Sequence, residues 1–166
     1  MVVTENLSKK AGNNQWYELQ ASPSDEFNAC FEKEKLFWMD MSNRGRFAYS
    51  NTKIYCNDKG FVMTGASLPY LCAILNSDIV TWAMKNIAST TGMGLMQWKK
   101  FSVERLPILQ ISDNAQKPFI DLMSKIIKAK NKNQRTTTFE EKINVMVYQL
   151  YKITDDEISL ISDSLS

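Results

Sequence analysis

The chain has 166 residues, of which 44% are hydrophobic and 11% aromatic, and its formal net charge is +2. This composition is typical of one folded domain with a substantial core and argues against intrinsic disorder. The chain has no histidine and only three widely spaced cysteines, Cys30, Cys56 and Cys72, so it offers neither a zinc-ligand cluster nor a Ser-His or Cys-His nucleophile pair. No apolar run approaches the roughly 18–20 residues of a membrane helix, so we expect a cytoplasmic protein with reduced thiols and no membrane partner.

Positive charge is concentrated in the middle of the sequence. Residues 41–112 carry a net charge of +5, whereas residues 1–40 carry a net charge of −3. A basic middle third suits a polyanionic partner, although a lysine-rich solvated face would give the same count.

In chain order, the first two thirds of the sequence predict strands and then one helix. Five short runs rich in aromatic and β-branched residues predict strands: NQWYELQ, KLFWMDM, RFAYS, KIYC and GFVMT. NDKG (57–60) is a plausible hairpin connection. Apolar residues at helical spacing then predict one amphipathic helix of about five turns over 66–89, with Ser67 as its N-cap and Pro69 in its first turn. The run FSVERLPILQI (101–111) predicts a strand or extended segment.

From residue 114 onward the pattern is helical, interrupted by the polar linker NKNQRTTT (131–138). Capping boxes at Thr138–Glu141 and Thr154–Glu157 predict two helix starts. The expected fold class is α+β: a small twisted mixed or antiparallel sheet packed against one long helix, followed by a C-terminal helical segment. We divide the chain into an α/β body over 1–112 and a helical tail over 113–166.

Sequence motifs for catalysis are missing. Gly92 and Gly94 do not complete a dinucleotide fingerprint, and no GxxxxGK[ST] phosphate loop occurs. The triplet Glu140-Glu141-Lys142 matches the E-x-K element of metal-dependent nucleases, but it opens a predicted helix, where glutamates serve the cap and the helix dipole. We therefore predict no catalytic residue and no metal site, and a chain that binds a partner.

Several short motifs occur in a defined order. They are Tyr70-Leu71, Leu75-Asn76-Ser77, the loop from Gly92 to Lys100, Leu106-Pro107-Ile108, and VYQLYKITDDE (147–157). Together they resemble the C-terminal specificity domain of TaqI-like and type IIG restriction-modification enzymes, over about residues 14–162. Residues 16–20 (WYELQ) also look like the opening of that family.

The resemblance implies a target-recognition domain for double-stranded DNA, which holds a short sequence for an adenine methyltransferase or a nuclease. The Asn-Pro-Pro-aromatic methyltransferase motif and the nuclease motifs are absent from this sequence. S-adenosylmethionine and magnesium are therefore expected only in catalytic parts outside the chain, in a longer parent polypeptide or a partner subunit. A homodimer is a further option. The alternative is a non-catalytic protein-interaction module that assembles through the C-terminal helices.

Two segments supply most of the candidate DNA contacts. In STTGMGLMQWKKF (89–101) the glycines would let the backbone approach a phosphate, the lysines would supply charge, and Trp98 would anchor the loop. Alternatively, Gly92 is a helix C-cap and residues 93–98 fill the core. In NRGR (43–46) two guanidiniums suit guanine readout, or form a solvated turn. The predicted DNA-binding residues are Arg44, Arg46, Asn51, Lys53, Thr90, Thr91, Gln97, Lys99 and Lys100. Lys125, Lys128, Lys130 and Lys132 would extend this footprint, although the tail helices are better explained by packing on the body, the methyltransferase part or a second copy.

Overall fold

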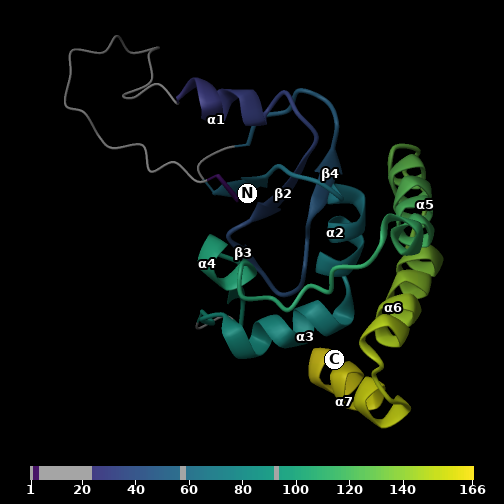
Figure 1. Ribbon diagram of the computed structural model, residues 1–166. Coiled ribbons are helices and arrows are strands. Elements are labelled where there is room, and N and C mark those ends of the chain that lie inside the picture. Colours follow the sequence, from purple (N-terminus) through teal and green to yellow (C-terminus); the bar gives the residue numbers. More distant parts are fainter. Residues whose placement is uncertain (1, 4–23, 57–58, 92–93) are drawn as a thin grey trace.

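The computed structural model describes residues 2–3, 24–56, 59–91 and 94–166 (Figure 1). The strands are β1 (Val2–Val3), β2 (Lys35–Met39), β3 (Met41–Ser42), β4 (Ala48–Ser50), β5 (Gly60–Met63) and β6 (Met96–Gln97). The helices are α1 (Asp25–Cys30), α2 (Leu68–Leu75), α3 (Asp78–Ile87), α4 (Lys100–Val103), α5 (Asp113–Lys130), α6 (Thr137–Tyr151) and α7 (Asp155–Leu165). The α+β fold class and the C-terminal helices are as predicted.

The larger sheet has the strand order β1-β5-β2-β4, with every neighbouring pair antiparallel. Side chains of β2 alternate between two environments, because successive residues of a strand point to opposite faces. Leu36 and Trp38 are buried on one face. On the other face, Lys35 is buried at the start of the strand, whereas Met39 at its end is 49% exposed. The buried face joins a core to which helix α2 contributes Cys72 and Ile74, both fully buried. Helix α2 therefore lies between this sheet and α5 (Figure 1).

The single long helix predicted over 66–89 is wrong: the structure has two helices, α2 and α3, with a break at Asn76 and Ser77. The Asn76 amide nitrogen donates to the carbonyl oxygens of Phe47 and Cys72, both at 2.8 Å. Ser77 then takes an extended conformation and precedes α3. An asparagine that bonds the backbone in this way competes with helix continuation. The helix start is correctly placed at Ser67, but that residue has a left-handed φ of 57° and makes no side-chain capping bond.

Other predicted strands also differ from the structure. KIYC (53–56) is not a strand, and β5 pairs with β2 rather than with this run. The segment 101–111 contains the short helix α4, followed by residues 104–112 without regular structure. Helix α1, which begins after Ser24, was not predicted. The runs NQWYELQ and WYELQ and residues 57–58 of the NDKG turn lie outside the described residues.

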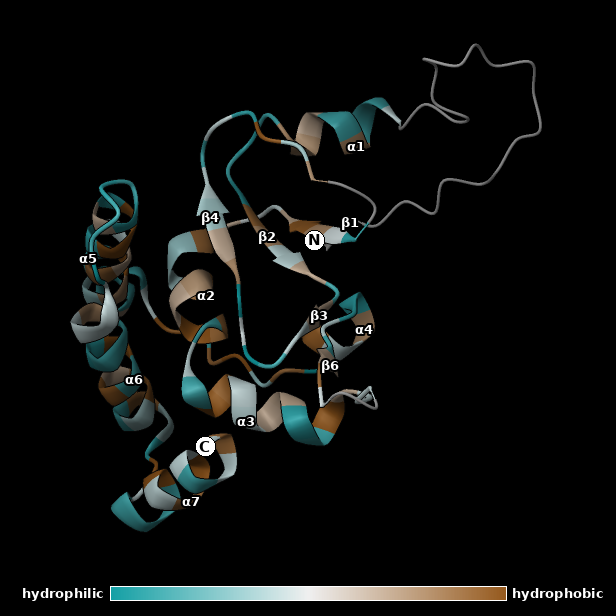
Figure 2. Ribbon diagram, turned by 180° about the vertical axis from the view of Figure 1, so that it is seen from behind, coloured by the Kyte–Doolittle hydropathy of each residue, from teal (hydrophilic) through white to brown (hydrophobic). Residues whose placement is uncertain are grey.

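The tail helices pack on the body. Helix α5 contacts α2, α6 contacts α5, and α7 contacts α3. Figure 2 shows apolar residues interspersed with hydrophilic ones along these helices. Of the apolar residues, Phe119, Met123, Val147 and Ile161 are buried in the common core. Of the three packing partners considered for the tail stripes, the structure shows the body, while the methyltransferase part and a second copy stay open. The domain division at residue 112 stays a prediction.

Only one of the two predicted capping boxes forms. The Thr154 hydroxyl accepts from the Glu157 backbone N–H, and the Glu157 carboxylate accepts from the Thr154 N–H at 2.8 Å. Helix α6 instead starts at Thr137, and Thr136 is its N-cap residue. The Thr136 hydroxyl donates to the Glu140 carboxylate at 2.8 Å. The box predicted at Thr138 is therefore wrong.

Candidate nucleic-acid interface

Strands β3 and β6 form a two-stranded antiparallel ribbon with one buried and one exposed face. Met41 lies opposite Gln97, and Ser42 lies opposite Met96. Directly opposite residues of such a pair share a face. Accordingly, Ser42 and Met96 are buried, whereas Met41 is 48% exposed and Gln97 is half-buried. The ribbon thus presents a methionine and a glutamine side by side toward solvent.

Trp98 fixes the ribbon to the body. Its side chain is buried, and its indole N–H donates to the carbonyl oxygen of Ser42 at 3.1 Å. Its backbone N–H donates to the Asp40 carbonyl at 2.7 Å, and its own carbonyl accepts from the Trp38 indole at 2.7 Å. The prediction that Trp98 anchors this loop is confirmed.

Positively charged side chains follow the ribbon directly. Lys99 is the N-cap of α4, and its backbone carbonyl accepts from the Ser102 and Val103 N–H groups, both at 3.0 Å. Its side-chain ammonium has no hydrogen-bond or ion-pair partner in the part of the chain that the structure describes. Lys100 lies 3.9 Å from Glu104, an ion pair between half-exposed side chains that contributes little to stability. Arg105, which follows the C-cap residue Glu104 of α4, is exposed. The two predicted lysines are therefore half-exposed, near a third cation that was not singled out from the sequence.

Thr90 and Thr91, which precede the ribbon strand β6, make contacts within their own loop. The Thr91 backbone N–H donates to the Leu95 carbonyl at 2.8 Å, and its hydroxyl accepts from the Leu95 N–H at 3.3 Å. Thr90 is exposed and forms an isolated bridge with Met96. Helix α3 ends at Ile87 with Ala88 as its C-cap, whereas Gly92 lies outside the described residues.

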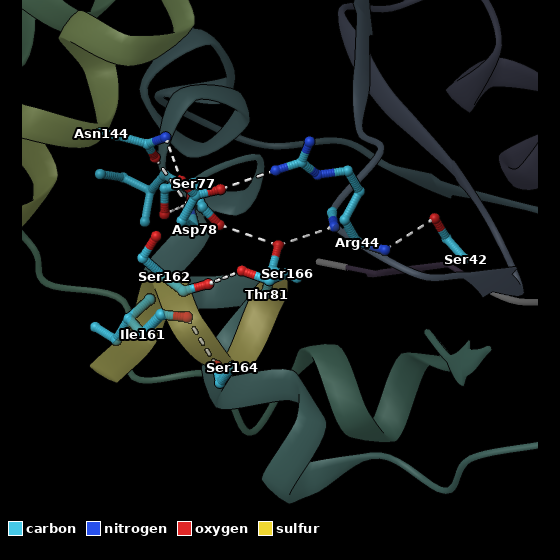
Figure 3. A network of polar contacts seen from close by, with 12 residues as sticks. Ser42, Arg44, Ser77, Asp78, Thr81, Asn144, Ile161, Ser162, Ser164 and Ser166 are labelled. Atoms are coloured by element: carbon cyan, nitrogen blue, oxygen red, sulfur yellow. Dashed lines mark hydrogen bonds and ion pairs between the residues drawn. The ribbon is translucent and has the colours of Figure 1, made fainter. Parts of the chain in front are cut away.

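Arg44 belongs to a separate polar network, shown in Figure 3. Its guanidinium donates to one Asp78 carboxylate oxygen at 2.9 Å, and Asn144 of α6 donates to the other at 2.7 Å. The Asp78 backbone N–H in turn donates to the Asn144 side-chain oxygen at 2.9 Å. Arg44 thus joins the β3–β4 connection to the start of α3, and the same carboxylate joins α3 to the tail. Arg46 is exposed and has no such partner among the described residues.

Asn51 and Lys53 lie in a third place, beyond the end of β4. Lys53 pairs with Glu32 at 2.5 Å, and this pairing lowers the pKa of Glu32 and raises that of Lys53. Fully buried Lys35 donates to the carbonyl oxygens of Lys33 and Thr52, both at 2.6 Å, and so fixes the same loop. Burial lowers the pKa of Lys35. The nine predicted residues therefore do not form one site.

The protein comparisons agree with the resemblance of the sequence. Residues 3–108 match the family of TaqI-like C-terminal specificity domains. The chain belongs to this family. No curated protein matches it significantly. The matched residues include the sheet, α2, α3, the ribbon and α4, and they end before α5.

The predicted DNA-binding residues fall into three groups: one at the ribbon and α4, one at Arg44 and Arg46, and one at Asn51 and Lys53. The first two groups differ in the charge that surrounds them. A groove of about 750 Å³ between the β3–β4 connection, α2 and α5–α6 contains Arg44 and Arg46. Its lining carries three basic side chains and three acidic ones, and Lys130 pairs with Glu140 at 3.2 Å. Burial opposes ionisation of Glu140, but hydrogen bonds from Thr136 and Lys130 outweigh it and lower its pKa. Such a charge-balanced groove is a poor match for a polyanion.

Around the ribbon, four cations (Lys59, Lys99, Lys100 and Arg105) outnumber the two acidic neighbours Asp40 and Glu104. We call this surface the ribbon–α4 surface and define it by Met39, Met41, Lys59, Gln97, Lys99, Lys100, Phe101 and Arg105. Lys59 is exposed, and its carbonyl oxygen accepts from the Asp40 N–H at 3.1 Å, which places it beside the β2–β3 junction. Met39 and Phe101 are 49% and 57% exposed. Sequence reasoning missed these apolar residues, although Met39 and Met41 share the outward positions of the β2–β3 alternation.

Two further findings concern other classes of site. Within the described ranges there is no cluster of three His, Cys, Asp or Glu side chains that could hold a metal ion. No helix in these ranges is both long and apolar enough to cross a membrane.

Proposed function

We propose that this domain binds double-stranded DNA through the ribbon–α4 surface. On this proposal it holds the DNA for an adenine methyltransferase or nuclease in the rest of a parent polypeptide or in a partner subunit. The family assignment supports a role in DNA specificity. The observation that carries the choice of surface is its charge: four exposed or half-exposed cations, Lys59, Lys99, Lys100 and Arg105, lie around the ribbon.

The physical roles on this surface divide in two. Cations at its edge would neutralise phosphates and fix the position of the protein on the duplex. Side chains on the exposed face of the ribbon would contact base edges, since a two-stranded ribbon fits the major groove. Because Trp98 holds the ribbon by three hydrogen bonds, little conformational freedom would be lost on binding.

Salt dependence of duplex binding tests the proposal. With about four phosphate contacts, the slope of log affinity on log salt concentration is expected near −3 to −4. Fluorescence anisotropy with a randomised duplex pool measures it. The double variant Lys99→Ala/Lys100→Ala should weaken binding to all sequences and make the slope shallower by about 2. Lys142→Ala, which removes an exposed lysine from α6, is the matched control and should change neither quantity.

Two results would contradict the proposal. One is failure of the wild-type domain to bind any duplex at low salt. The other is binding that the Lys99/Lys100 double variant leaves unchanged, since the cations of the ribbon–α4 surface would then carry none of the affinity.

An assembly module is the second candidate function, favoured by exposed apolar side chains on the tail. Val145 on α6 is 55% exposed and Leu160 on α7 is 68% exposed. If they mediate assembly, Val145→Glu and Leu160→Glu should lower the association state measured by sedimentation while leaving duplex binding intact. Assembly that both variants leave unchanged would remove this reason for the second function.

A further inference from the structure

We propose that Gln97 and Met41 together read one A·T base pair in the major groove. The Gln97 carboxamide would bind the adenine edge, and the Met41 side chain would pack on the thymine methyl group. This inference rests on the proposed function above and adds which residues of the ribbon–α4 surface contact bases, and which base pair they prefer.

The register of the ribbon places the two side chains together. Met41 and Gln97 are direct antiparallel partners, so their Cβ atoms lie about 4.5–5.5 Å apart on one face. Their neighbours Ser42 and Met96 occupy the opposite, buried face. A base pair that meets the exposed face would therefore meet a carboxamide and a thioether side by side.

The Gln97 side chain is available for a bidentate contact. Its backbone N–H is used, donating to the Ser89 carbonyl at 3.0 Å, but its side-chain amide has no hydrogen-bond partner in the described ranges. The amide carries a donor and an acceptor, which match the N7 acceptor and N6 donor of adenine. Because Trp98, the next residue, is fixed to the body, the position of the Gln97 backbone is set in advance.

Met41 supplies the apolar half of the contact. The C5-methyl of thymine is the apolar feature of the major groove, and it lies on the partner base of the adenine that Gln97 would bind. Met39, two residues earlier on the outward side of the chain, extends the exposed apolar surface. The Lys59 carbonyl oxygen accepts from the N–H of Asp40, which lies between the two methionines, and the cations of the ribbon–α4 surface favour a polyanion over an apolar protein partner.

Base analogues in a duplex selected from the pool test the assignment. Replacing one adenine by 7-deazaadenine removes the N7 acceptor, and replacing the paired thymine by uracil removes the methyl group. At one position the wild type should lose about 10-fold in affinity with 7-deazaadenine. It should lose about 4-fold with uracil at the paired position. Gln97→Ala should abolish sensitivity to the first analogue, and Met41→Ala sensitivity to the second.

A second variant makes the test independent of simple loss of binding. Glu accepts from cytosine N4 rather than pairing with adenine. Gln97→Glu should therefore shift the selected base at that position from adenine to cytosine. Gln149→Ala and Leu160→Ala, at exposed positions of α6 and α7, are the controls and should retain both analogue effects. Circular dichroism confirms that each variant is folded.

The outcomes separate this inference from the proposed function. If the wild type binds duplex with the expected salt slope but Gln97→Ala keeps the full sensitivity to 7-deazaadenine, the base-reading assignment is overturned and the proposed function stands. An unchanged base preference in Gln97→Glu has the same meaning. If the wild type binds no duplex, both are overturned.

Discussion

The indole N–H of Trp98 donates to the carbonyl oxygen of Ser42, 56 residues earlier in the chain, at a distance of 3.1 Å. This bond is buried. It connects Trp98, the residue directly after β6, to Ser42 of β3, just before the chain continues to Lys99 and Lys100. The position of the basic segment therefore depends on one aromatic residue of the core.

Replacing Trp98 by Phe tests this dependence. Phe fills much of the same volume but cannot donate, so the Ser42 carbonyl would be left buried without its indole partner. We expect the free energy of unfolding to fall by about 1–3 kcal/mol. Urea denaturation measures the loss. Phe101→Leu, at a residue that is 57% exposed, is the control and should change stability by less than about 0.5 kcal/mol. Equal stability of the Trp98→Phe variant and the wild type would show that the bond is not needed.

The sequence predicted those parts of the fold that depend on local pattern. Aromatic and β-branched runs marked β2, β4 and β5, and helical spacing marked the tail helices. The break at Asn76 could not be seen, because Leu75 and Ile79 keep an i, i+4 spacing across it. The strands of the ribbon are two residues long, too short for any periodicity to identify them.

The candidate site was predictable only in part, for a related reason. Trp98 and the two following lysines were identified from the sequence, because a large aromatic side chain is expected to be buried and adjacent lysine side chains are expected to stay in contact with water. The ion pair of Arg44 was not identified, since its partner Asp78 lies 34 residues away in the sequence. Asn144, which contacts the same carboxylate, lies a further 66 residues from Asp78. Tertiary packing determines which cations stay free for solvent and which form ion pairs within the protein.

Gly45 is expected to tolerate no side chain. A Cβ at this position would lie 2.2 Å from the Leu75 carbonyl oxygen, which is a backbone atom, so one of the two chain segments would have to move. The Gly45 N–H also donates to the Thr81 hydroxyl at 3.1 Å. Gly45→Ala should therefore cost at least about 3 kcal/mol.

Gly94→Ala is the matched comparison for Gly45→Ala. Gly94 has a φ of +74° and no atom within 4 Å of an added Cβ, so only its backbone conformation opposes alanine. We expect a cost of about 1–2 kcal/mol. Chemical denaturation of the two variants ranks them. If Gly94→Ala were the more damaging change, the close approach at Gly45 would not be a constraint.

Asn144→Ala should destabilise the contact between the tail and the body. The change removes the acceptor for the Asp78 N–H and the donor to the Asp78 carboxylate, both at a part-buried site. We expect a loss of about 1–3 kcal/mol in the free energy of unfolding. Gln149→Ala on the same helix, at an exposed position, should cost less than about 0.5 kcal/mol. Similar values for the two variants would indicate that the Asp78 contacts do not stabilise the fold.

Thr154→Ala should be more costly than Thr138→Ala, although both threonines precede a glutamate by three residues. Thr154 accepts from the Glu157 N–H and completes a reciprocal cap, so its loss should cost about 1 kcal/mol. Thr138 lies inside α6, is exposed and caps nothing, so alanine there should have an effect within about 0.5 kcal/mol. Thermal denaturation distinguishes them. The reverse order would mean that α6 starts at Thr138.

Cys72 should make the fold sensitive to alkaline pH. Burial raises the pKa of its thiol from 9.0 to about 12, although Asn76 donates to the sulfur at 3.4 Å and opposes the shift. The unfolded chain loses this proton above about pH 9, whereas the folded chain retains it. Stability from this group is therefore fully present below pH 9 and is lost as pH rises toward 12.

Comparison with Cys72→Ala isolates this contribution, because tyrosines and lysines titrate alike in both proteins. Under reducing conditions, the stability advantage of the wild type over Cys72→Ala should shrink by about 2 kcal/mol between pH 8 and pH 10.5. Urea denaturation at several pH values measures the difference. A difference that stays constant over this range would show that the thiol ionises as readily in the folded protein as in the unfolded chain, and that Cys72 is not shielded from water as the structure places it.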